Sequence, residues 1–410
     1  MSHGSARRAW MISVRQDFPL QAFEAFLDSL DGPAHHDIQI PNKIKSNAVG
    51  AVAALIQLII TWSRQNPGES ALRLYAEDEV DDSAKKFAET PFGLVALNMA
   101  HRIVSRGRAP LSRRDALKNS LQYVRCMHVG ELSALKEYNR SILPVICIDN
   151  ASELRRPVRL YRQNSDELRS REAFSALVRN CFRELSRVKL EDDEAQVKDI
   201  ASFVYEAFQN THEHAQTDLE GNRYLRSSRG VIFSFQSSSL ERLSSSDTEV
   251  GALNEYLKGI QLQYAHHRDA HFAEVSVFDS GPGLAQSWLS HDGDAIKRTL
   301  KLKPRLEGIP IDVEYSAVME CLNKGKTTKG SASRGNGLYR IMQVVKRNGG
   351  MVRMRTGRLS VMKSFSEKSI KDLVSEDLQM VDVTSGAIPT EARSWSEGCV
   401  ITVLMPLNRR

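Results

Sequence analysis

The sequence predicts an α/β protein built from two domains, a small one over residues 1–150 and a larger one over residues 151–410. Three observations support this fold class. The chain has 410 residues, enough for two or three domains with hydrophobic cores. Strand-like and helix-like patterns alternate in the first part, and a long helical pattern is followed by alternating strand patterns in the second. Hydrophobic residues make up 41% of the chain and charged residues 26%, as in ordinary soluble globular proteins.

The charge balance argues against a strongly basic or strongly acidic protein. The 56 lysine and arginine residues are nearly matched by 50 aspartate and glutamate residues, which leaves a net charge of +6. This charge permits a nucleic-acid partner without indicating one. The segments 105–125 and Leu154–Arg162 are rich in basic residues. No known nucleic-acid-binding motif accompanies them, so a solvated basic face is the better interpretation.

Cysteine usage and hydropathy predict a cytoplasmic protein that does not associate with membranes. The five cysteines are widely spaced and include no CxxC pair: Cys126, Cys147, Cys181, Cys321 and Cys399. This usage is typical of reduced thiols rather than of a disulfide framework or a zinc site. The longest apolar run, Ala48–Trp62, is too short to cross a bilayer and contains Gln57. We therefore expect a buried helix at this run.

The first domain is predicted from a β-α-β-α order of patterns. Asp37–Pro41 has the pattern of a short strand, and Val49–Arg64 that of a helix that is apolar nearly all round. Ala71–Ala76 alternates like a strand, and Ser83–Arg106 is helical with a pause at Pro91. This order predicts a small α/β domain with a regulatory or interaction role, which weakly resembles the STAS-like domains of bacterial signalling proteins.

The second domain begins with two predicted helices and a strand. Ser165–Arg187 carries an amphipathic helical pattern, and Asp193–Gln216 carries a longer one. The alternation of Val231, Phe233 and Phe235 is typical of a strand with one buried face.

The helix over Asp193–Gln216 carries the first candidate site. Glu206, Asn210 and His214 lie four residues apart and form a stripe beside the apolar one. Because a helix turns about 100° per residue, this row lies at the rim of the buried face. A solvated helix flank is the alternative interpretation of the row by itself.

The second candidate site follows a strand within Ala273–Leu284. Val275 and Val277 predict a strand that delivers Asp279 at its end, and Gly281 and Gly283 follow in a turn. A carboxylate there can accept a hydrogen bond from an exocyclic amine, and glycines allow a planar ring to approach the backbone. By itself this DxGxG pattern is also common in ordinary turns.

The third candidate site lies in Lys324–Gly350. A basic, flexible segment leads into Gly335, Asn336 and Gly337, and a helix with an apolar side follows. Glycines that open a helix expose backbone N–H groups where the helix dipole favours an anion such as a phosphate. The segment lacks the GxxxxGK[ST] pattern of a Walker A loop.

The three motifs together, in this order, resemble the GHKL ATPase family, which includes gyrase B subunits, Hsp90-type chaperones, MutL-type repair proteins, histidine kinases and anti-sigma-factor serine kinases. The resemblance covers about residues 165–407. Gly349–Ser364 resembles the hairpin after the family's lid helix, and Glu397–Leu407 its closing strand. The resemblance implies a Bergerat two-layer α/β sandwich with a mixed sheet. The segment Phe365–Trp395 would be an insertion before the last strand.

The resemblance also implies roles for individual residues. Asp279 would bind the adenine amino group, and Thr402 on the closing strand would be a second adenine contact. Asn210 would hold the Mg²⁺ that bridges the phosphates of ATP, so ATP and Mg²⁺ are the expected cofactors. The other nucleotide-binding positions come from the three motifs and from the lid between them: His214, Gly281, Gly283, Lys326, Thr327, Lys329, Arg334, Gly335, Asn336, Gly337 and Leu338.

Two functions are compatible with this resemblance. In the first, Glu206 is the general base of an ATPase or of a kinase that phosphorylates a protein hydroxyl. The motif EAFQNTHEHA is most similar to the anti-sigma-factor serine kinases, and the helix Ser165–Arg187 lacks the phosphoacceptor histidine of a histidine kinase. In the second, ATP orders the lid and changes a partner or dimer surface with little hydrolysis. Either function implies a protein partner or self-association in bacterial-type signalling.

Overall fold

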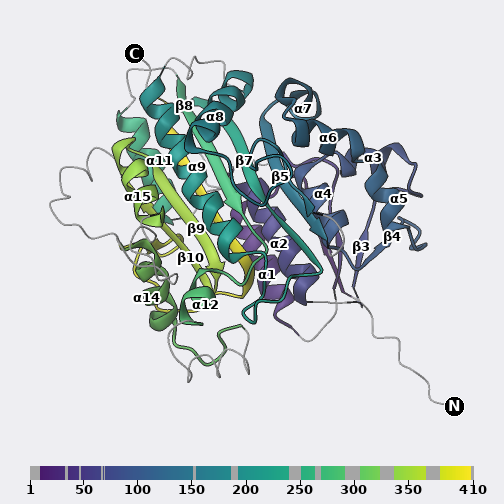
Figure 1. Cartoon of the computed structure of the whole chain (residues 1–410). Helices are drawn as coiled ribbons and strands as arrows, with labels where there is room; N and C mark the ends of the chain where they lie inside the picture. The colour runs from purple at the N-terminus through teal and green to yellow at the C-terminus, as the bar shows by residue number, and fades with distance from the viewer. Residues whose placement is uncertain are drawn as a thin grey trace.

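Figure 1 shows two β-sheets with helices packed between and around them. The structure is a computed structural model of the chain. It describes residues 10–32, 36–45, 48–65, 68, 70–150, 154–185, 193–239, 251–263, 269–290, 305–323, 337–365 and 379–407.

The smaller sheet has four parallel strands in the order β1-β2-β3-β4. The strands are β1 (Trp10–Ser13), β2 (His36–Gln39), β3 (Ala71–Arg73) and β4 (Arg102–Val104). The helices between them are α1 (Leu20–Leu30), α2 (Ala51–Gln65), α3 (Asp82–Ala88) and α4 (Pro91–Met99). The predicted α/β order is therefore confirmed, and β1, α1 and β4 are additional elements.

The pause predicted at Pro91 within the helical segment Ser83–Arg106 is confirmed, but the predicted end of the helix is wrong. α3 ends at Ala88, and Thr90 caps α4, because its side-chain oxygen accepts a hydrogen bond from the Gly93 N–H (2.9 Å). Pro91 occupies the first turn of α4, where its missing N–H has no consequence. The helix then ends at Met99 and the chain enters β4.

The boundary predicted at residue 150 also differs from the structure. Three short helices, α5 (Arg113–Lys118), α6 (Leu121–Val129) and α7 (Leu132–Tyr138), lead to β5 (Ile142–Asn150). β5 pairs with β7 in the larger sheet, so that sheet begins near residue 142. The seven central residues of β5 are all buried, which is the burial expected of a strand covered on both faces.

The larger sheet has eight strands in the order β11-β10-β9-β12-β8-β7-β5-β6. The remaining strands are β6 (Leu154–Arg155), β7 (Arg226–Ser239), β8 (Asp269–Phe278), β9 (Met351–Gly357), β10 (Leu359–Ser364), β11 (Val381–Asp382) and β12 (Ser396–Pro406). Each pair among these described strands is antiparallel, so the expectation of a mixed sheet is wrong. The hairpin predicted over Gly349–Ser364 is confirmed as β9 and β10.

One face of the larger sheet carries the helices of the second domain. They are α8 (Arg171–Leu185), α9 (Glu194–His214), α12 (Leu284–Leu289), α14 (Ile311–Leu322) and α15 (Gly337–Arg347), and α11 (Gly251–Gln263) lies against β10. α9 packs on β7 and β8, and α8 and α15 flank it (Figure 1). Asp193 caps α9, because its carboxylate accepts a hydrogen bond from the Gln196 N–H (3.0 Å).

The opposite face of the larger sheet is covered by the N-terminal helices. α2 packs on β12 and β8, and α4 packs on β7 and β5. α2 also reaches the smaller sheet, where Trp62 donates its Nε1–H to the carbonyl oxygen of His36 (2.6 Å). Because α2 contacts both sheets, it is apolar nearly all round, as its sequence indicates. The expected two-layer sandwich is therefore wrong: the larger sheet has helices on both faces.

Buried polar contacts also join the two parts of the chain. Arg355 of β9 is 2% exposed and pairs with Glu24 of α1 (Nε to Oε1, 3.1 Å). It also donates to the carbonyl oxygens of Gly357 (2.6 Å) and Ser394 (2.6 Å). Gln57 of α2 donates to the carbonyl oxygen of Arg355 (3.0 Å). The N-terminal part is thus fixed to the larger sheet by hydrogen bonds as well as by apolar packing.

Replacing Arg355 by leucine is expected to lower the free energy of unfolding by about 3 kcal/mol, because Glu24 and several buried carbonyl oxygens lose a charged donor. Urea denaturation measures this loss. Lys86→Ala is the control: it removes an exposed ion pair with Asp82, and we expect no measurable change in stability. Equal stabilities of the two variants would contradict the buried role of Arg355.

Candidate functional site

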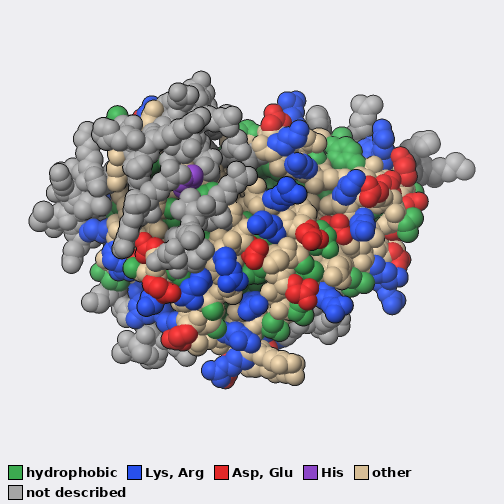
Figure 2. Space-filling model, turned by 90° about the horizontal axis from the view of Figure 1, so that it is seen from above, with side chains coloured by type: hydrophobic (Ala, Val, Ile, Leu, Met, Phe, Trp, Pro, Cys, Tyr) green, Lys and Arg blue, Asp and Glu red, His purple; other side chains and the backbone are tan. Residues whose placement is uncertain are grey.

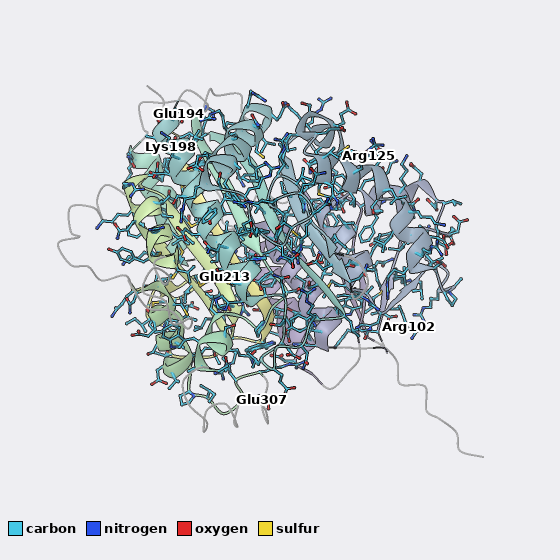
Figure 3. All side chains as sticks on the ribbon, in the orientation of Figure 1. Arg102, Arg125, Glu194, Lys198, Glu213 and Glu307 are labelled. Atoms are coloured by element: carbon cyan, nitrogen blue, oxygen red, sulfur yellow. The ribbon has the colours of Figure 1, made fainter. Side chains whose placement is uncertain are left out.

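The candidate site is a pocket of about 310 Å³ between α9 and the helices α12, α14 and α15, with β8 and β12 as its floor. α9 runs along the sheet from Glu194 and Lys198 at one end to Glu213 at the other (Figure 3). The pocket lies over its C-terminal half. Its wall contains residues from all three predicted motifs: Glu206, Asn210, His214, Asp279, Gly283, Gly337 and Leu338.

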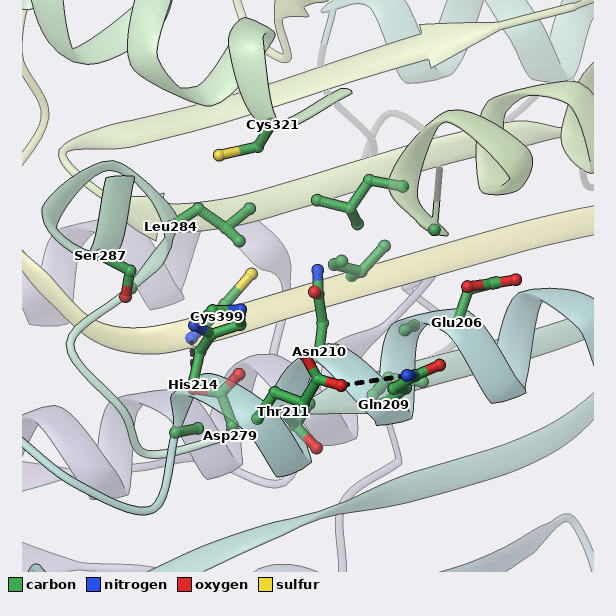
Figure 4. A pocket seen from close by; sticks show the side chains of 18 of the residues that line it. Glu206, Gln209, Asn210, Thr211, His214, Asp279, Leu284, Ser287, Cys321 and Cys399 are labelled. Atoms are coloured by element: carbon green, nitrogen blue, oxygen red, sulfur yellow. Dashed lines mark hydrogen bonds between the residues drawn. The ribbon is translucent and has the colours of Figure 1, made fainter. Parts of the chain in front are cut away.

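The row on α9 faces this pocket. Glu206, Asn210 and His214 all line it, with Glu206 at one end and His214 toward Asp279 at the other (Figure 4). Glu206 is 6% exposed, and Asn210 and His214 are partly buried. The interpretation of the row as a cleft edge is therefore supported over that of a solvated flank. The adjacent apolar stripe, which includes Phe203 and Phe208, is buried in the core.

Asp279 lies directly after β8, with one carboxylate oxygen held by the backbone. Its Oδ1 accepts hydrogen bonds from the N–H groups of Gly281 (2.9 Å) and Cys399 (3.2 Å). Within the described part of the chain its Oδ2 makes no hydrogen bond, and the residue lines the pocket. Burial raises the pKa of Asp279 to about 6, against the lowering effect of the two N–H donors. The carboxylate can thus offer Oδ2 to a donor on a ligand.

The two glycines after Asp279 have different surroundings. A Cβ on Gly281 would lie 2.6 Å from Cα of Ala215, so this glycine allows the loop to approach the end of α9. It does not line the pocket. Gly283 does line the pocket, has a φ of 85°, and precedes α12. Of the two glycines, only Gly283 borders the pocket.

Thr402 lies on the other face of the sheet from the pocket, so its predicted adenine contact is wrong. Its Oγ1 lies 2.8 Å from Oγ of Ser276, and a Cβ on Gly50 would lie 2.8 Å from the same atom. Cys399 and Ile401 are the β12 side chains that face the pocket. Since side chains alternate along a strand, Thr402 faces the N-terminal helices.

Replacing Thr402 by valine is expected to leave nucleotide affinity unchanged. The free energy of unfolding should fall by about 1 kcal/mol, because the Ser276 hydroxyl loses its partner. Calorimetric titration and urea denaturation measure the two quantities. A loss of affinity without a loss of stability would contradict this placement.

Most of the predicted lid lies outside the described residues. This group is Lys326, Thr327, Lys329, Arg334, Gly335 and Asn336. Gly337 and Leu338 are described: they open α15 and line the pocket. A Cβ on Gly337 would lie 2.9 Å from Oε2 of Glu206, so the N-terminus of α15 is close to that carboxylate.

Two arginines of the pocket were missed by the sequence interpretation. Oε1 of Glu206 accepts hydrogen bonds from Arg171 of α8 and from Arg340 of α15 (2.9 Å for Arg340). The guanidinium of Arg171 also lies 4.2 Å from the centre of the Tyr205 ring. Arg340 follows Gly337 by three residues, which is one turn of α15 and could have indicated it. No sequence signal indicates Arg171, because it lies 35 residues before Glu206.

Near Asp279 the pocket wall is largely apolar. Val277, Leu284 and Ile401 line it, together with the thiols of Cys321 and Cys399. Burial raises the pKa of Cys321 to about 12 and that of Cys399 well above its usual value, so both thiols are neutral. This part of the pocket therefore suits a flat, mostly apolar group with one donor directed at Asp279.

The N-terminal helix α2 supports the loops around Asp279 from the opposite face. Arg64 donates to the carbonyl oxygen of Ser280 (3.3 Å), and its guanidinium lies 3.7 Å from the centre of the Tyr224 ring. The hydroxyl of Thr61 accepts a hydrogen bond from the N–H of Glu397 (3.0 Å). The loop that carries Asp279 and the start of β12, which carries Cys399, thus contact the N-terminal part.

The described residues add observations on metal ligands, on surface charge and on membrane-spanning helices. Among the described residues, no group of three or more histidine, cysteine, aspartate or glutamate side chains could hold a metal ion. On the face shown in Figure 2, Lys and Arg side chains are interspersed with Asp, Glu and apolar side chains. None of the helices in the described ranges has the length and apolarity needed to cross a membrane.

Comparison of the chain with protein-family models, with curated proteins and with solved structures gave no match.

Proposed function

We propose that this chain is an ATP-binding protein of the GHKL type, in which the pocket binds Mg-ATP. One observation carries the proposal: residues from three motifs, which together span more than 120 residues of the sequence, line one pocket. Asp279 lies at one end, Asn210 in the middle and Glu206 at the other end (Figure 4). The proposal includes a Bergerat-type larger unit and a STAS-like N-terminal unit.

The pocket fits an adenine base at the Asp279 end. Oδ2 of Asp279 would accept a hydrogen bond from the exocyclic amine, while Val277, Leu284 and Ile401 would contact the ring. The cavity volume of about 310 Å³ lies within the range of roughly 300–1,000 Å³ that is typical of small-molecule sites. Guanine carries a carbonyl where adenine carries the amine, so Asp279 would disfavour GTP.

The Glu206 end of the pocket fits the phosphates. The N-terminus of α15, an eleven-residue helix, presents backbone N–H groups from Gly337 onward, and Arg171 and Arg340 add positive charge. Asn210 would hold a Mg²⁺ ion, which commonly takes only one or two protein ligands beside phosphate oxygens and water. When bound, the ion would neutralise charge on the phosphates.

Glu206 is the proposed general base. Its carboxylate would take the proton of a water or of a protein hydroxyl as that oxygen attacks the γ-phosphorus and ADP leaves. The product is inorganic phosphate in the first case and a phosphoprotein in the second. The proposed setting is cytoplasmic, bacterial-type signalling through a protein partner or through self-association.

A switch without turnover is the second candidate, and one observation favours it. Oε1 of Glu206 accepts hydrogen bonds from both Arg171 and Arg340, so in this arrangement that oxygen is shielded from a water or a hydroxyl. ATP would then order the lid and change a partner surface. For this candidate, Asp279→Asn abolishes partner binding and Glu206→Gln leaves it intact.

The two candidates are separated by following the γ-phosphate of labelled Mg-ATP with the wild type and Glu206→Gln. Free phosphate from the wild type alone indicates an ATPase, and label on protein indicates a kinase. Saturable binding with neither product supports the switch. No binding at all would overturn both candidates.

A further inference from the structure

Glu206 is enclosed by groups from two other helices. Its Oε1 accepts hydrogen bonds from Arg171 and Arg340, and its Oε2 lies against the backbone at the start of α15, where a Cβ on Gly337 would be 2.9 Å away. The carboxylate is 6% exposed. Both of its oxygens are therefore covered by the protein.

The two arginine side chains are much more exposed than Glu206, the acceptor that they share. The side chain of Arg171 is 43% exposed and that of Arg340 is 51% exposed, and both line the pocket. A guanidinium has five N–H donors, and among the described residues Glu206 is the one hydrogen-bond acceptor of each. Two cations meet one carboxylate, so this end of the pocket carries an excess positive charge. Such an arrangement suits an anion larger and more highly charged than a carboxylate.

We propose that Arg171 and Arg340 bind the terminal phosphate of ATP, and that their transfer from Glu206 to this phosphate uncovers the carboxylate. This inference rests on the proposed function of the pocket. No covalent bond changes in the transfer: two guanidinium groups exchange one oxygen acceptor for another. Phosphate oxygens match the planar donors of arginine and carry more negative charge than Glu206, so the exchange is favourable.

The exchange makes Glu206 sensitive to the γ-phosphate. When no γ-phosphate is bound, both arginines cover Oε1 and the start of α15 lies against Oε2, so a water or a hydroxyl has no open approach to the carboxylate. With ATP bound, the same arginines hold the group to be transferred, and Glu206 becomes free for the attacking water or hydroxyl. ADP lacks the terminal phosphate, so it leaves the arginines on Glu206. The site thus distinguishes ATP from ADP through Arg171 and Arg340.

The test compares the affinities for Mg-ATP and Mg-ADP by calorimetric titration of the full chain. We expect Arg171→Gln and Arg340→Gln each to weaken ATP binding about tenfold while ADP binding stays unchanged. Matched controls on the same helices are Arg179→Gln and Arg347→Gln, whose side chains pair with Glu194 and Asp199 and do not line the pocket. The controls should leave both affinities as in the wild type.

Glu206→Gln should change ATP affinity in the opposite direction from the arginine variants, because a neutral amide holds the two arginines less strongly than a carboxylate does. We expect this variant to bind ATP severalfold more tightly and ADP as the wild type does. Thermal melting establishes that each variant is folded, and Arg171→Lys and Arg340→Lys replace any that is not. With lysine, ATP binding should still weaken more than ADP binding, since the planar fork is lost.

Three outcomes would overturn the inference. Equal losses of ATP and ADP affinity in the arginine variants would show that the arginines hold the fold or the diphosphate. If the wild type binds ATP and the ratio of the ATP and ADP affinities is the same in all variants, the proposed role of the arginines is overturned and the proposed function of the pocket is kept. No ATP binding by the wild type would overturn the proposed function as well.

Discussion

Replacing Asp279 by asparagine is expected to weaken ATP binding about a hundredfold, which corresponds to about 2.7 kcal/mol. The reason is that the two carboxylate oxygens of Asp279 have different partners. Oδ1 is held by the N–H groups of Gly281 and Cys399, and an asparagine can keep these bonds through its own oxygen. Its NH₂ group then takes the place of Oδ2, so a donor faces the donor of adenine.

Calorimetric titration with ATP measures this loss, and thermal melting shows whether the variant is folded. The retained bonds to Gly281 and Cys399 predict a melting temperature close to that of the wild type. Wild-type affinity in a folded Asp279→Asn variant would contradict the assignment of Asp279 to the base.

Acidification should weaken ATP binding for the same reason. Burial raises the pKa of Asp279 to about 6. Since Oδ1 accepts two N–H groups, the proton is added at Oδ2, which then donates instead of accepting. Affinity should fall about tenfold per pH unit below pH 6 and stay constant above pH 7. Mg-tripolyphosphate is the control ligand, because it has the titrating phosphates of ATP without the base; an equal pH dependence of both ligands would contradict the role of Asp279.

Replacing Glu206 by glutamine is expected to lower the rate of γ-phosphate release or transfer by about 10²–10⁴-fold, as removal of a positioned general base does. ATP binding is retained, because Asp279, Asn210 and the start of α15 are unchanged. Single-turnover experiments with labelled ATP at saturating protein measure the chemical step separately from binding.

The control for this variant is Glu213→Gln, which alters another carboxylate of α9 at the pocket wall, beside Gln209. It should keep the wild-type rate within about threefold, as expected for a carboxylate that has no part in proton transfer. A normal rate in Glu206→Gln would contradict its role as the base.

The parts of the site that follow from local periodicity were predictable. Glu206, Asn210 and His214 share a face because helical spacing is fixed by short-range hydrogen bonds. Asp279 ends a strand because Val275 and Val277 alternate into it and glycines follow. Such patterns need no knowledge of distant segments.

The parts that depend on distant pairing were not predictable. β5 was assigned to the N-terminal domain, although it pairs with β7 about 80 residues later. Thr402 was assigned from the resemblance alone, whereas the face of its side chain depends on the packing of β12 against the N-terminal helix α2. The position of Arg171 beside Glu206 could not be predicted from the sequence, because it results from the packing of α8 against α9.

The most direct test of the central claim is a crystal structure of the chain with Mg²⁺ and a non-hydrolysable ATP analogue. We predict the adenine amine at Oδ2 of Asp279, the metal ion at Asn210, and the terminal phosphate at the start of α15 with Arg171 and Arg340. An analogue bound in the reverse orientation or at another place on the molecule would contradict the account. So would a pocket that remains without nucleotide at saturating concentrations.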